Sequence, residues 1–321
     1  MPRFDVTTYG EGGLRLSVPA GRRLETTNSL DVDVAGTEAN VVGALVRLGW
    51  RCGWVSALPS SGPGRRVAHA LRAAGVDLAA VRWRDQGRLS CYYIEYALPP
   101  RATTVLYDRR DSCFTQMRAA DVDWPYLLDT RHLHLSGLTY PLSPHAGEII
   151  REALARAQAA GIGTSLDINH RDQLWSAEQC RDALLPLCRG VDLLFCSRRD
   201  AHRVFGCADD CAEVAAERLC ECTGARRVVM SSSAAGVVAH GPEGTWHCAA
   251  RPTVILDRAG AGDALAAGVL HGWLRADLRA GLRYGSTLAA MALSQYGDMV
   301  VTDAAELERL NAGGPQADIE R

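Results

Sequence analysis

The stretch DRAGAGDALAAGVL, residues 257–270, places a carboxylate just behind a bend that few side chains crowd. Glycine lets backbone N–H groups approach a ligand closely because it has no Cβ. A helix that begins near Ala261 would direct its free N–H groups and its positive dipole end at that space, which suits a phosphate group. The stretch therefore predicts phosphoryl transfer, with Asp263 as the base that takes a proton from the attacking hydroxyl. The backbone of Gly260, Ala261 and Gly262 would form the anion hole.

Taken alone, this motif is equally typical of a glycine-rich helix start whose aspartate only stabilises the helix. The surrounding elements therefore decide between a chemical and a structural role for Asp263. Strand-like runs alternate with amphipathic helical runs, which is typical of an α/β fold with a parallel sheet and helices on both faces. The expected strands are 132–138, 163–169, 191–197 and 226–232, the expected helices are 143–161, 176–188, 200–206 and 211–224, and a hairpin is expected over 234–250.

The first hundred residues follow a different pattern. Helices are expected over 40–49 and 64–75, whereas 87–97 and 103–109 alternate apolar and polar residues as a half-exposed antiparallel sheet would. We expect these strands to stand off the main sheet as a small lid. The sequence thus predicts a single domain over 1–310, with lid strands drawn from about 9–19, 29–36 and 87–109, and a C-terminal tail over 311–321.

Composition excludes some partners. The net charge is −2, from 35 basic and 37 acidic side chains, and every basic side chain is arginine. This balance gives no general attraction to nucleic acid or to an anionic membrane. The start MPRFDVTTYG lacks the apolar core of a signal peptide, and no apolar run reaches the length of a spanning helix. We therefore expect a cytoplasmic protein.

Two separated blocks resemble a known family. DRAGAGDALAAGVL resembles the Asp-Thr-x-Gly-Ala-Gly-Asp block of the ribokinase-like (PfkB) carbohydrate kinases, and VAGTEANVVGALVRLGWRCGWVS, residues 34–56, resembles their N-terminal block. Within that family, residues 9–19, 104–113 and 165–175 resemble the 2-keto-3-deoxygluconate kinases. The resemblance implies a ribokinase-like three-layer α/β/α core with a mostly parallel sheet and a small β-sheet lid.

The resemblance also implies a set of substrate-binding residues. Arg109 and Arg171 would hold the carboxylate and keto end of a sugar acid, because an arginine fork matches a carboxylate. For the arginines the alternative is a surface ion pair, and for the tyrosines below it is cross-strand packing. The further residues implied at the sugar are Gly36, Asn40, Tyr92, Tyr107 and Asp298, although Asp298 is also typical of a turn at a helix end.

On the nucleotide side, the resemblance implies that ATP lies beside the glycine turn. Ser197 and Asp200 match the family's Asn/Ser-x-x-Glu motif, whose acid organises Mg²⁺. The other residues implied at the nucleotide are Ser231, Ser233, Gly236 and Arg258. The family pattern is broken in three places: the loop SSSAAG, residues 231–236, lacks the usual lysine, Arg258 stands where the family has threonine, and Ser61 replaces an acid.

The function predicted from these features is the ATP-dependent phosphorylation of a sugar acid, 2-keto-3-deoxygluconate, to its 6-phosphate. Two alternatives remain open: a kinase of the same family for fructose, ribose or 5-keto-2-deoxygluconate, and a non-catalytic, sugar-binding regulatory homologue with a decayed nucleotide site. An apolar face of the lid around Tyr93 and Leu106 further predicts a homodimer formed through the lid.

Overall fold

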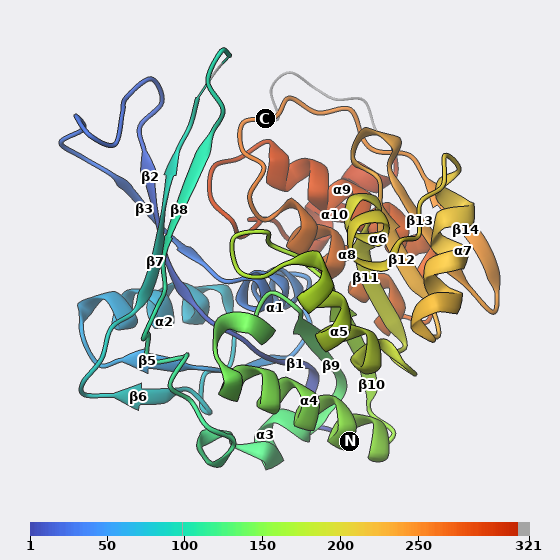
Figure 1. Ribbon diagram of the computed structural model, residues 1–321, viewed down its shortest axis with the longest axis horizontal. Helices are drawn as coiled ribbons and strands as arrows, with labels where there is room; N and C mark the ends of the chain where they lie inside the picture. Colours follow the sequence, from blue (N-terminus) through green and yellow to red (C-terminus); the bar gives the residue numbers. More distant parts are fainter. Residues whose placement is uncertain (98, 314–321) are drawn as a thin grey trace.

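An eight-stranded sheet lies at the centre of the structure, a computed structural model that describes residues 1–97 and 99–313 (Figure 1). Adjacent strands from β12 to β4 are parallel, and at the other edge β13 pairs antiparallel with both β12 and β14. The strand order is β14 (Gly244–Cys248), β13 (Val237–Gly241), β12 (Val228–Ser231), β11 (Leu193–Ser197), β10 (Gly163–Asp167), β9 (Thr130–Ser136), β1 (Phe4–Tyr9) and β4 (Cys52–Val55).

Helices cover both faces of this sheet, and each face has its own apolar core. One core contains buried side chains of α3 (Trp124–Leu128), α4 (Pro144–Ala159), α5 (Ala177–Cys188), α6 (Arg198–Phe205) and α7 (Ala212–Thr223). The other contains side chains of α1 (Thr37–Arg47), α2 (Gly62–Ala74), α8 (Ala261–Leu274), α9 (Leu278–Leu293) and α10 (Ala304–Asn311). Three 3₁₀ turns, η1 (Ala119–Asp121), η2 (Tyr140–Leu142) and η3 (Ser233–Ala235), complete the described helical elements. The predicted α/β fold with a mostly parallel sheet is confirmed.

A second, four-stranded sheet forms the lid, which stands at the upper left of Figure 1. Its order is β3 (Asp31–Ala35), β2 (Gly13–Val18), β7 (Ser90–Glu95) and β8 (Thr104–Asp108). The outer pairs are antiparallel, but the central strands β2 and β7 are parallel. The antiparallel arrangement expected for 87–97 and 103–109 is confirmed by β7 and β8, whereas the sequence made no prediction for the pairing of β2 with β7. Between β2 and β7 the chain crosses to the core and back, and such a crossover returns the second strand in the same direction.

The stretch 9–19, from which a lid strand was expected, is divided between two sheets. Tyr9 ends β1, which is a central strand of the core, and the lid strand β2 begins only at Gly13. The chain turns from core to lid within three residues. A small parallel pair, β5 (Ala57–Pro59) with β6 (Arg82–Arg84), lies apart from both sheets.

Helices α8 and α9 approach each other with almost no side chain between them. A Cβ on Gly268 would lie 2.4 Å from the backbone nitrogen of Gly285, and one on Gly272 would lie 2.3 Å from the backbone of Gly281. Such contacts leave no room for a larger residue. The backbone of α9 therefore fixes α8, the helix that carries Asp263 at its start.

The end of the chain follows the prediction in part. Helix α10 runs to Asn311, one residue past the predicted domain end, and positions 314–321 of the predicted tail lie outside the described residues. The extent of the single domain, 1–310, stays a prediction. Within the described residues, no helix combines the length and the apolar character needed to cross a membrane.

Candidate active site

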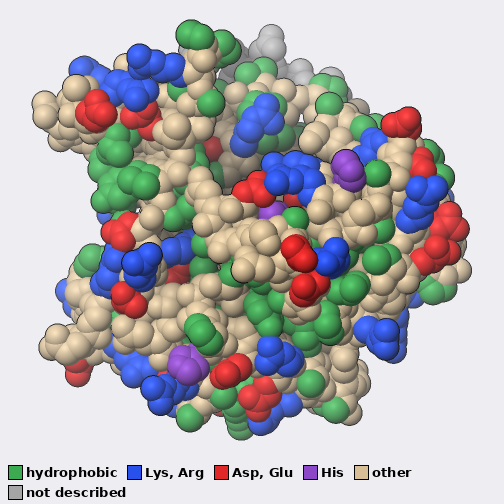
Figure 2. Space-filling model, viewed as in Figure 1, with side chains coloured by type: hydrophobic (Ala, Val, Ile, Leu, Met, Phe, Trp, Pro, Cys, Tyr) green, Lys and Arg blue, Asp and Glu red, His purple; other side chains and the backbone are tan. Residues whose placement is uncertain are grey.

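A cavity of about 1310 Å³ separates the lid from the carboxyl ends of the core strands. Figure 2 shows the molecule hollowed there, with arginine and acidic side chains gathered around the opening. The wall of the cavity is formed by lid strands β2, β7 and β8, by the start of α1, by the ends of β10, β11 and β12, and by the turn before α8. Ligands bind at this edge of open α/β sheets.

Residues 259–263, called the glycine turn below, lead into helix α8 and include its first three residues. This segment has the shape that the sequence predicted. Helix α8 begins at Ala261, and its N-cap Gly260 has φ 77°, a conformation that favours glycine. A Cβ at Gly260 would lie 1.8 Å from the carbonyl oxygen of Asp298. The N–H of Ala264 is the first to bond back, to Gly260 O at 2.8 Å. The N–H groups of residues 261–263, which come before Ala264 in the first turn of α8, are therefore oriented for an anion.

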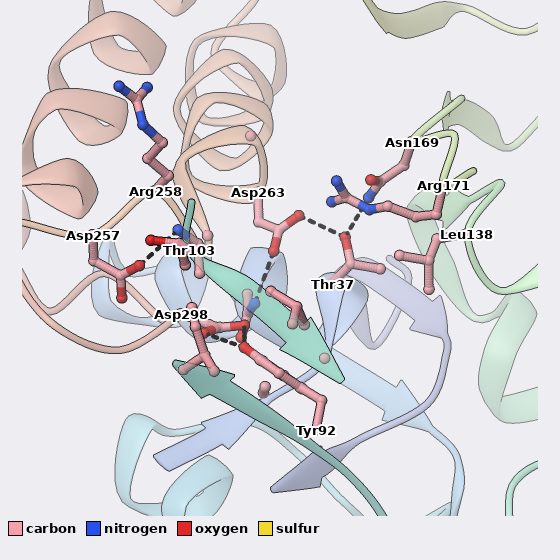
Figure 3. Close-up of a pocket in the computed structure, with 18 of the residues that line it drawn as sticks. Thr37, Tyr92, Thr103, Leu138, Asn169, Arg171, Asp257, Arg258, Asp263 and Asp298 are labelled. Atoms are coloured by element: carbon pink, nitrogen blue, oxygen red, sulfur yellow. Dashed lines mark hydrogen bonds between the residues drawn. The ribbon is translucent and has the colours of Figure 1, made fainter. Parts of the chain in front are cut away.

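Helix α1 holds the carboxylate of Asp263 from the opposite side (Figure 3). Thr37 Oγ1 donates to Asp263 Oδ1 at 2.5 Å, and Asn40 Nδ2 donates to Asp263 Oδ2 at 2.8 Å. Asn169 Nδ2, at the end of β10, donates to Thr37 Oγ1 at 3.1 Å and so orients its hydroxyl. Burial raises the pKa of Asp263 to about 6, and the bonds from Thr37 and Asn40 act in the opposite direction.

Two further carboxyl groups lie near Asp263. Burial and repulsion by Asp263 raise the pKa of Asp167 to about 7. Burial is also the main cause that raises the pKa of Glu38 to about 8, although Thr139 Oγ1 donates to this carboxyl at 2.6 Å. Of the three groups, Asp263 has the lowest pKa and is ionised first as the pH rises. It is therefore the carboxylate best able to accept a proton near neutral pH.

The lid contributes a tyrosine pair that meets an acid from the segment after α9. Tyr92 and Tyr107 lie opposite each other on β7 and β8, with ring centroids 5.6 Å apart. The hydroxyl of Tyr92 donates to Asp298, lying 2.7 Å from both of its carboxylate oxygens. All three residues line the cavity. The two tyrosines therefore pack against each other across the strands and also line the cavity.

The two arginines expected at the substrate both line the cavity, and they enter it from different elements. Arg109, just after β8, stacks over the ring of Tyr107 at 4.7 Å, and its Nε lies 3.5 Å from Glu11 Oε2. That Nε is buried without a hydrogen-bond partner. Arg171 follows β10 and lies beside Asn169 and Thr37 (Figure 3). Two cations thus face the same cavity from the lid and from the core.

On the other side of the glycine turn, Ser197 caps α6 by accepting the N–H of Asp200 at 3.0 Å. Asp200 is 5% exposed, and its Oδ1 has no hydrogen-bond partner, although Arg199 Nε lies 3.5 Å away. Ser197 and Ser231 are register partners at the ends of neighbouring strands β11 and β12. These residues line the cavity together with Ser233 and Arg258. The guanidinium of Arg258 extends away from Asp263 (Figure 3).

Three singled-out positions lie elsewhere. Gly236 is not among the residues that line the cavity: it has φ 95°, and a Cβ there would lie 2.1 Å from Cys248 O. Its carbonyl accepts the N–H of Ser232, so it shapes the loop. Ala261 is also outside the cavity lining and offers only its backbone. Ser61 is the N-cap of α2 and does not reach the cavity, so this departure from the family pattern leaves the site unaltered. The expected sugar-side residues Gly36 and Asn40 both line the cavity.

Residues 9–305 match the pfkB family carbohydrate kinases. The chain belongs to this family. The predicted membership and the predicted enzyme class, a carbohydrate kinase, are thereby confirmed. The match covers the lid and the α/β core apart from most of β1 and α10, so the family assignment does not depend on the glycine turn alone.

Individual relatives of this pfkB protein carry more specific names. The chain is 36% identical to the 2-dehydro-3-deoxygalactonokinase of Haloferax volcanii, over 97% of each chain. It is 25% identical to the 5-dehydro-2-deoxygluconokinase of Shouchella clausii, over 92% of this chain and 91% of the relative. Among solved structures, it is similar to the 2-dehydro-3-deoxygluconokinase of Thermotoga maritima, with a TM-score of 0.87, 29% identity, and coverage of 97% and 98% of the two chains.

Sequence reasoning missed several residues of this pfkB site. Thr37 stands inside the block VAGTEAN, and its place one residue after Gly36 was the available signal. Asn169 and Asp167 stand inside a motif that was read for Arg171 alone. The fully buried Arg15 had no signal, because an arginine within an alternating strand is typical of a solvent-facing position.

The hydrogen bonds to Asp263 predict a measurable titration. Carboxyl ¹³C shifts, assigned by comparison with Asp263→Asn, should give Asp263 a pKa of about 6. Replacing Asn40 by Leu removes a donor that stabilises the ionised form, so the pKa should rise. Asn311→Leu, a change of the same kind at the distant end of α10, is the control and should leave the Asp263 titration in place. A pKa below 4 for Asp263, or no rise in Asn40→Leu, would contradict this account.

Proposed function

We propose that this protein transfers the γ-phosphoryl group of ATP to the 6-hydroxyl of a 2-keto-3-deoxy sugar acid. The acceptor is 2-keto-3-deoxygluconate or its galactonate epimer. The observation that carries the proposal is the Asp263 carboxylate, which faces the cavity at the N-terminus of α8 while Thr37 and Asn40 hold both of its oxygens. This arrangement supports a base next to an anion hole.

The residues on the nucleotide side fit a magnesium nucleotide. The free N–H groups of the glycine turn suit the transferring phosphoryl group. Ser197 and Ser231 line the part of the cavity in which we place the rest of the nucleotide. The buried, unpartnered Oδ1 of Asp200 is an oxygen of the kind Mg²⁺ prefers. Bound Mg²⁺ would offset the phosphate charge. Arg258 supplies a cation on this side of the cavity, where the loop 231–236 lacks the family lysine.

In the proposed reaction, the 6-oxygen of the sugar acid forms a bond to the γ-phosphorus as its proton passes to Asp263. The bond from that phosphorus to the β,γ-bridging oxygen breaks, and ADP leaves. The N–H groups of residues 261–263 would stabilise the charge on the transferring group, where one such donor is typically worth about 10²–10³ in rate. To accept this proton, Asp263 must be ionised near neutral pH. Its pKa of about 6 meets this requirement.

The preference for an acid over a neutral sugar is supported by Arg109 and Arg171. Both guanidinium groups line the cavity, and a neutral sugar offers neither of them a charged partner. The names of the Haloferax and Thermotoga relatives, both kinases of 2-dehydro-3-deoxy sugar acids, support the same acceptor class.

Asp263→Asn is the first test. The change keeps the shape of the side chain but removes its basicity, so kcat should fall by about 10²–10⁴. Binding of the sugar acid, measured by calorimetry, should change by less than about threefold, because the base acts on the reacting proton rather than on the carboxylate of the substrate. Near-normal turnover in Asp263→Asn would exclude Asp263 as the base.

A substrate panel tests the acceptor class. ADP release should be fastest with 2-keto-3-deoxygluconate and its galactonate epimer, and slower with 5-keto-2-deoxygluconate, fructose and ribose. Arg171→Met should lower kcat/KM for the acids by about 10–10²-fold, the loss expected for one charge-assisted contact, and leave neutral sugars nearly unchanged.

The control for this panel is Arg181→Met, which removes an exposed arginine paired with Asp182 on α5. It should alter neither class of substrate. If Arg171→Met harms neutral sugars as much as acids, then the carboxylate assignment is wrong. If no sugar in the panel releases ADP, the protein is the non-catalytic, sugar-binding homologue instead.

We also propose that two copies pair through their lids. The outer strand β8 exposes Leu106, which is 59% exposed, next to Tyr93 on β7. Light scattering at micromolar concentration should give twice the chain mass, and Leu106→Glu should shift it toward the monomer, since a buried charge opposes association. A monomeric mass for the unmodified protein would overturn this proposal.

A further inference from the structure

Arg15 is an arginine with no access to solvent, and it joins the lid to the core. It lies on lid strand β2 and has 0% of its side chain exposed. Its guanidinium forms ion pairs with Asp257 and with Asp298, the latter through Nη1 and Oδ1 at 2.7 Å. It also donates to Ser17 Oγ at 2.9 Å and to the hydroxyl of Tyr96. A guanidinium with this many partners has one arrangement and little freedom.

Both acids paired with Arg15 shape the glycine turn. Asp257 Oδ1 accepts the N–H of Ala259 at 3.1 Å, which is the first residue of the turn. The backbone carbonyl of Asp298 lies against Gly260, where even a Cβ would approach it to 1.8 Å. The two segments that fix the turn, before α8 and after α9, are thus held by one side chain from the lid.

The same arginine lies beside the sugar side of the cavity. In the parallel pairing of β2 with β7, Arg15 is the register partner of Tyr92. The hydroxyl of Tyr92 donates to Asp298, the acid that Arg15 also binds. A ligand that moves Tyr92 therefore acts on a carboxylate shared with Arg15, and through it on the segment that contacts Gly260.

Charge interactions oppose any separation of Arg15 from Asp257 and Asp298. Asp257 and Asp298 are both buried, at 2% and 9% exposure. Burial, with a smaller contribution from the charge of Asp257, raises the pKa of Asp298, while Arg15 acts in the opposite direction. Removing one member of a buried ion pair leaves an uncompensated charge, which is strongly unfavourable. The lid therefore cannot shift away from the glycine turn without moving Arg15 or separating the three charges.

We propose that Arg15 is a positioning residue that couples sugar binding under the lid to the shape of the glycine turn, so that sugar acid and nucleotide bind cooperatively. This inference rests on the proposed function. By linkage, each ligand then strengthens the other by the same factor, typically about 5–150-fold for coupled sites.

Calorimetry with 2-keto-3-deoxygluconate and a non-hydrolysable ATP analogue with Mg²⁺ tests the coupling. In the unmodified protein, each ligand should bind at least about fivefold more tightly when the other is saturating. Arg15→Met, which keeps the length of the side chain without its charge, should reduce this factor to about one. Its Kd for each ligand alone should stay within about threefold, while kcat falls by about 10²-fold, as expected for a slightly misplaced reacting group.

Arg66→Met is the matched control. Arg66, on α2, also joins core to lid, because its Nη2 donates to the carbonyl of Val32 on β3 at 2.6 Å. It contacts neither Asp257 nor Asp298 in the described hydrogen bonds and ion pairs. This variant should keep the full cooperativity. If Arg66→Met loses cooperativity equally, tethering of the lid in general is responsible and the role assigned to Arg15 is wrong.

Two milder variants keep the test decisive if Arg15→Met does not fold. Arg15→Lys retains a charge but not the fork, and Tyr96→Phe removes one hydroxyl partner of the guanidinium. Both should fold and show cooperativity below that of the unmodified protein, with Arg15→Lys the lower.

The outcomes separate the two proposals. Failure of the unmodified protein to bind the nucleotide analogue, or to release ADP with any sugar acid, would overturn the proposed function. An active kinase that binds the two ligands independently, or that keeps full cooperativity in the Arg15 variants, would overturn the inference about Arg15 and leave the proposed function standing.

Discussion

The site depends on keeping one carboxylate charged in a place that has little water. Burial opposes the ionised form of Asp263, whereas two side-chain donors from α1 and the N-terminus of α8 favour it. The balance between these opposing effects sets the pKa of Asp263 near neutral pH. It requires α1 and α8 to meet at a fixed distance, since a hydrogen bond weakens steeply when its partners separate.

Much of the remaining architecture provides that distance. At the glycine contacts, the backbones of α8 and α9 touch directly, which fixes the position of α8. Helix α1 lies in the same apolar core. The lid completes the enclosure from the far side, where Tyr92 and Arg15 meet Asp298. The core thus holds Asp263, while the residues proposed to recognise the acceptor come from the lid and from the core. At the glycine turn, lid and core meet through the buried ion pairs of Arg15.

The sequence predicted the core well because its signals are local. The alternation of strands and helices and the turn that begins α8 each depend on neighbouring residues, and the structure has them where expected. The alternating pattern of 87–97 and 103–109 correctly indicated an antiparallel pair, but the parallel direction of β7 against β2 depends on the path of the chain between them and has no local signal.

Candidate site residues divided in the same way. Those inside short motifs, such as Asp263 and Asp200, were candidates from the sequence, and they line one cavity. The partners that adjust Asp263 were not found, because they come together only in the folded chain: Thr37 lies 226 positions before Asp263, and Asn169 acts through Thr37, which lies 132 positions before it. Arg15 illustrates the limit of residue type as a guide: a buried guanidinium is expected only once both acids that neutralise it are known.

The arginine-only composition has a chemical consequence at this cavity. A 2-keto acid carries an electrophilic carbonyl that primary amines attack to form imines. The cations facing the cavity, among them Arg109, Arg171 and Arg258, are guanidinium groups, which stay protonated and are poor nucleophiles. With no lysine anywhere in the sequence, no side-chain amine can form an imine with the carbonyl of the proposed acceptor, so its carboxylate can be bound by cations without that side reaction.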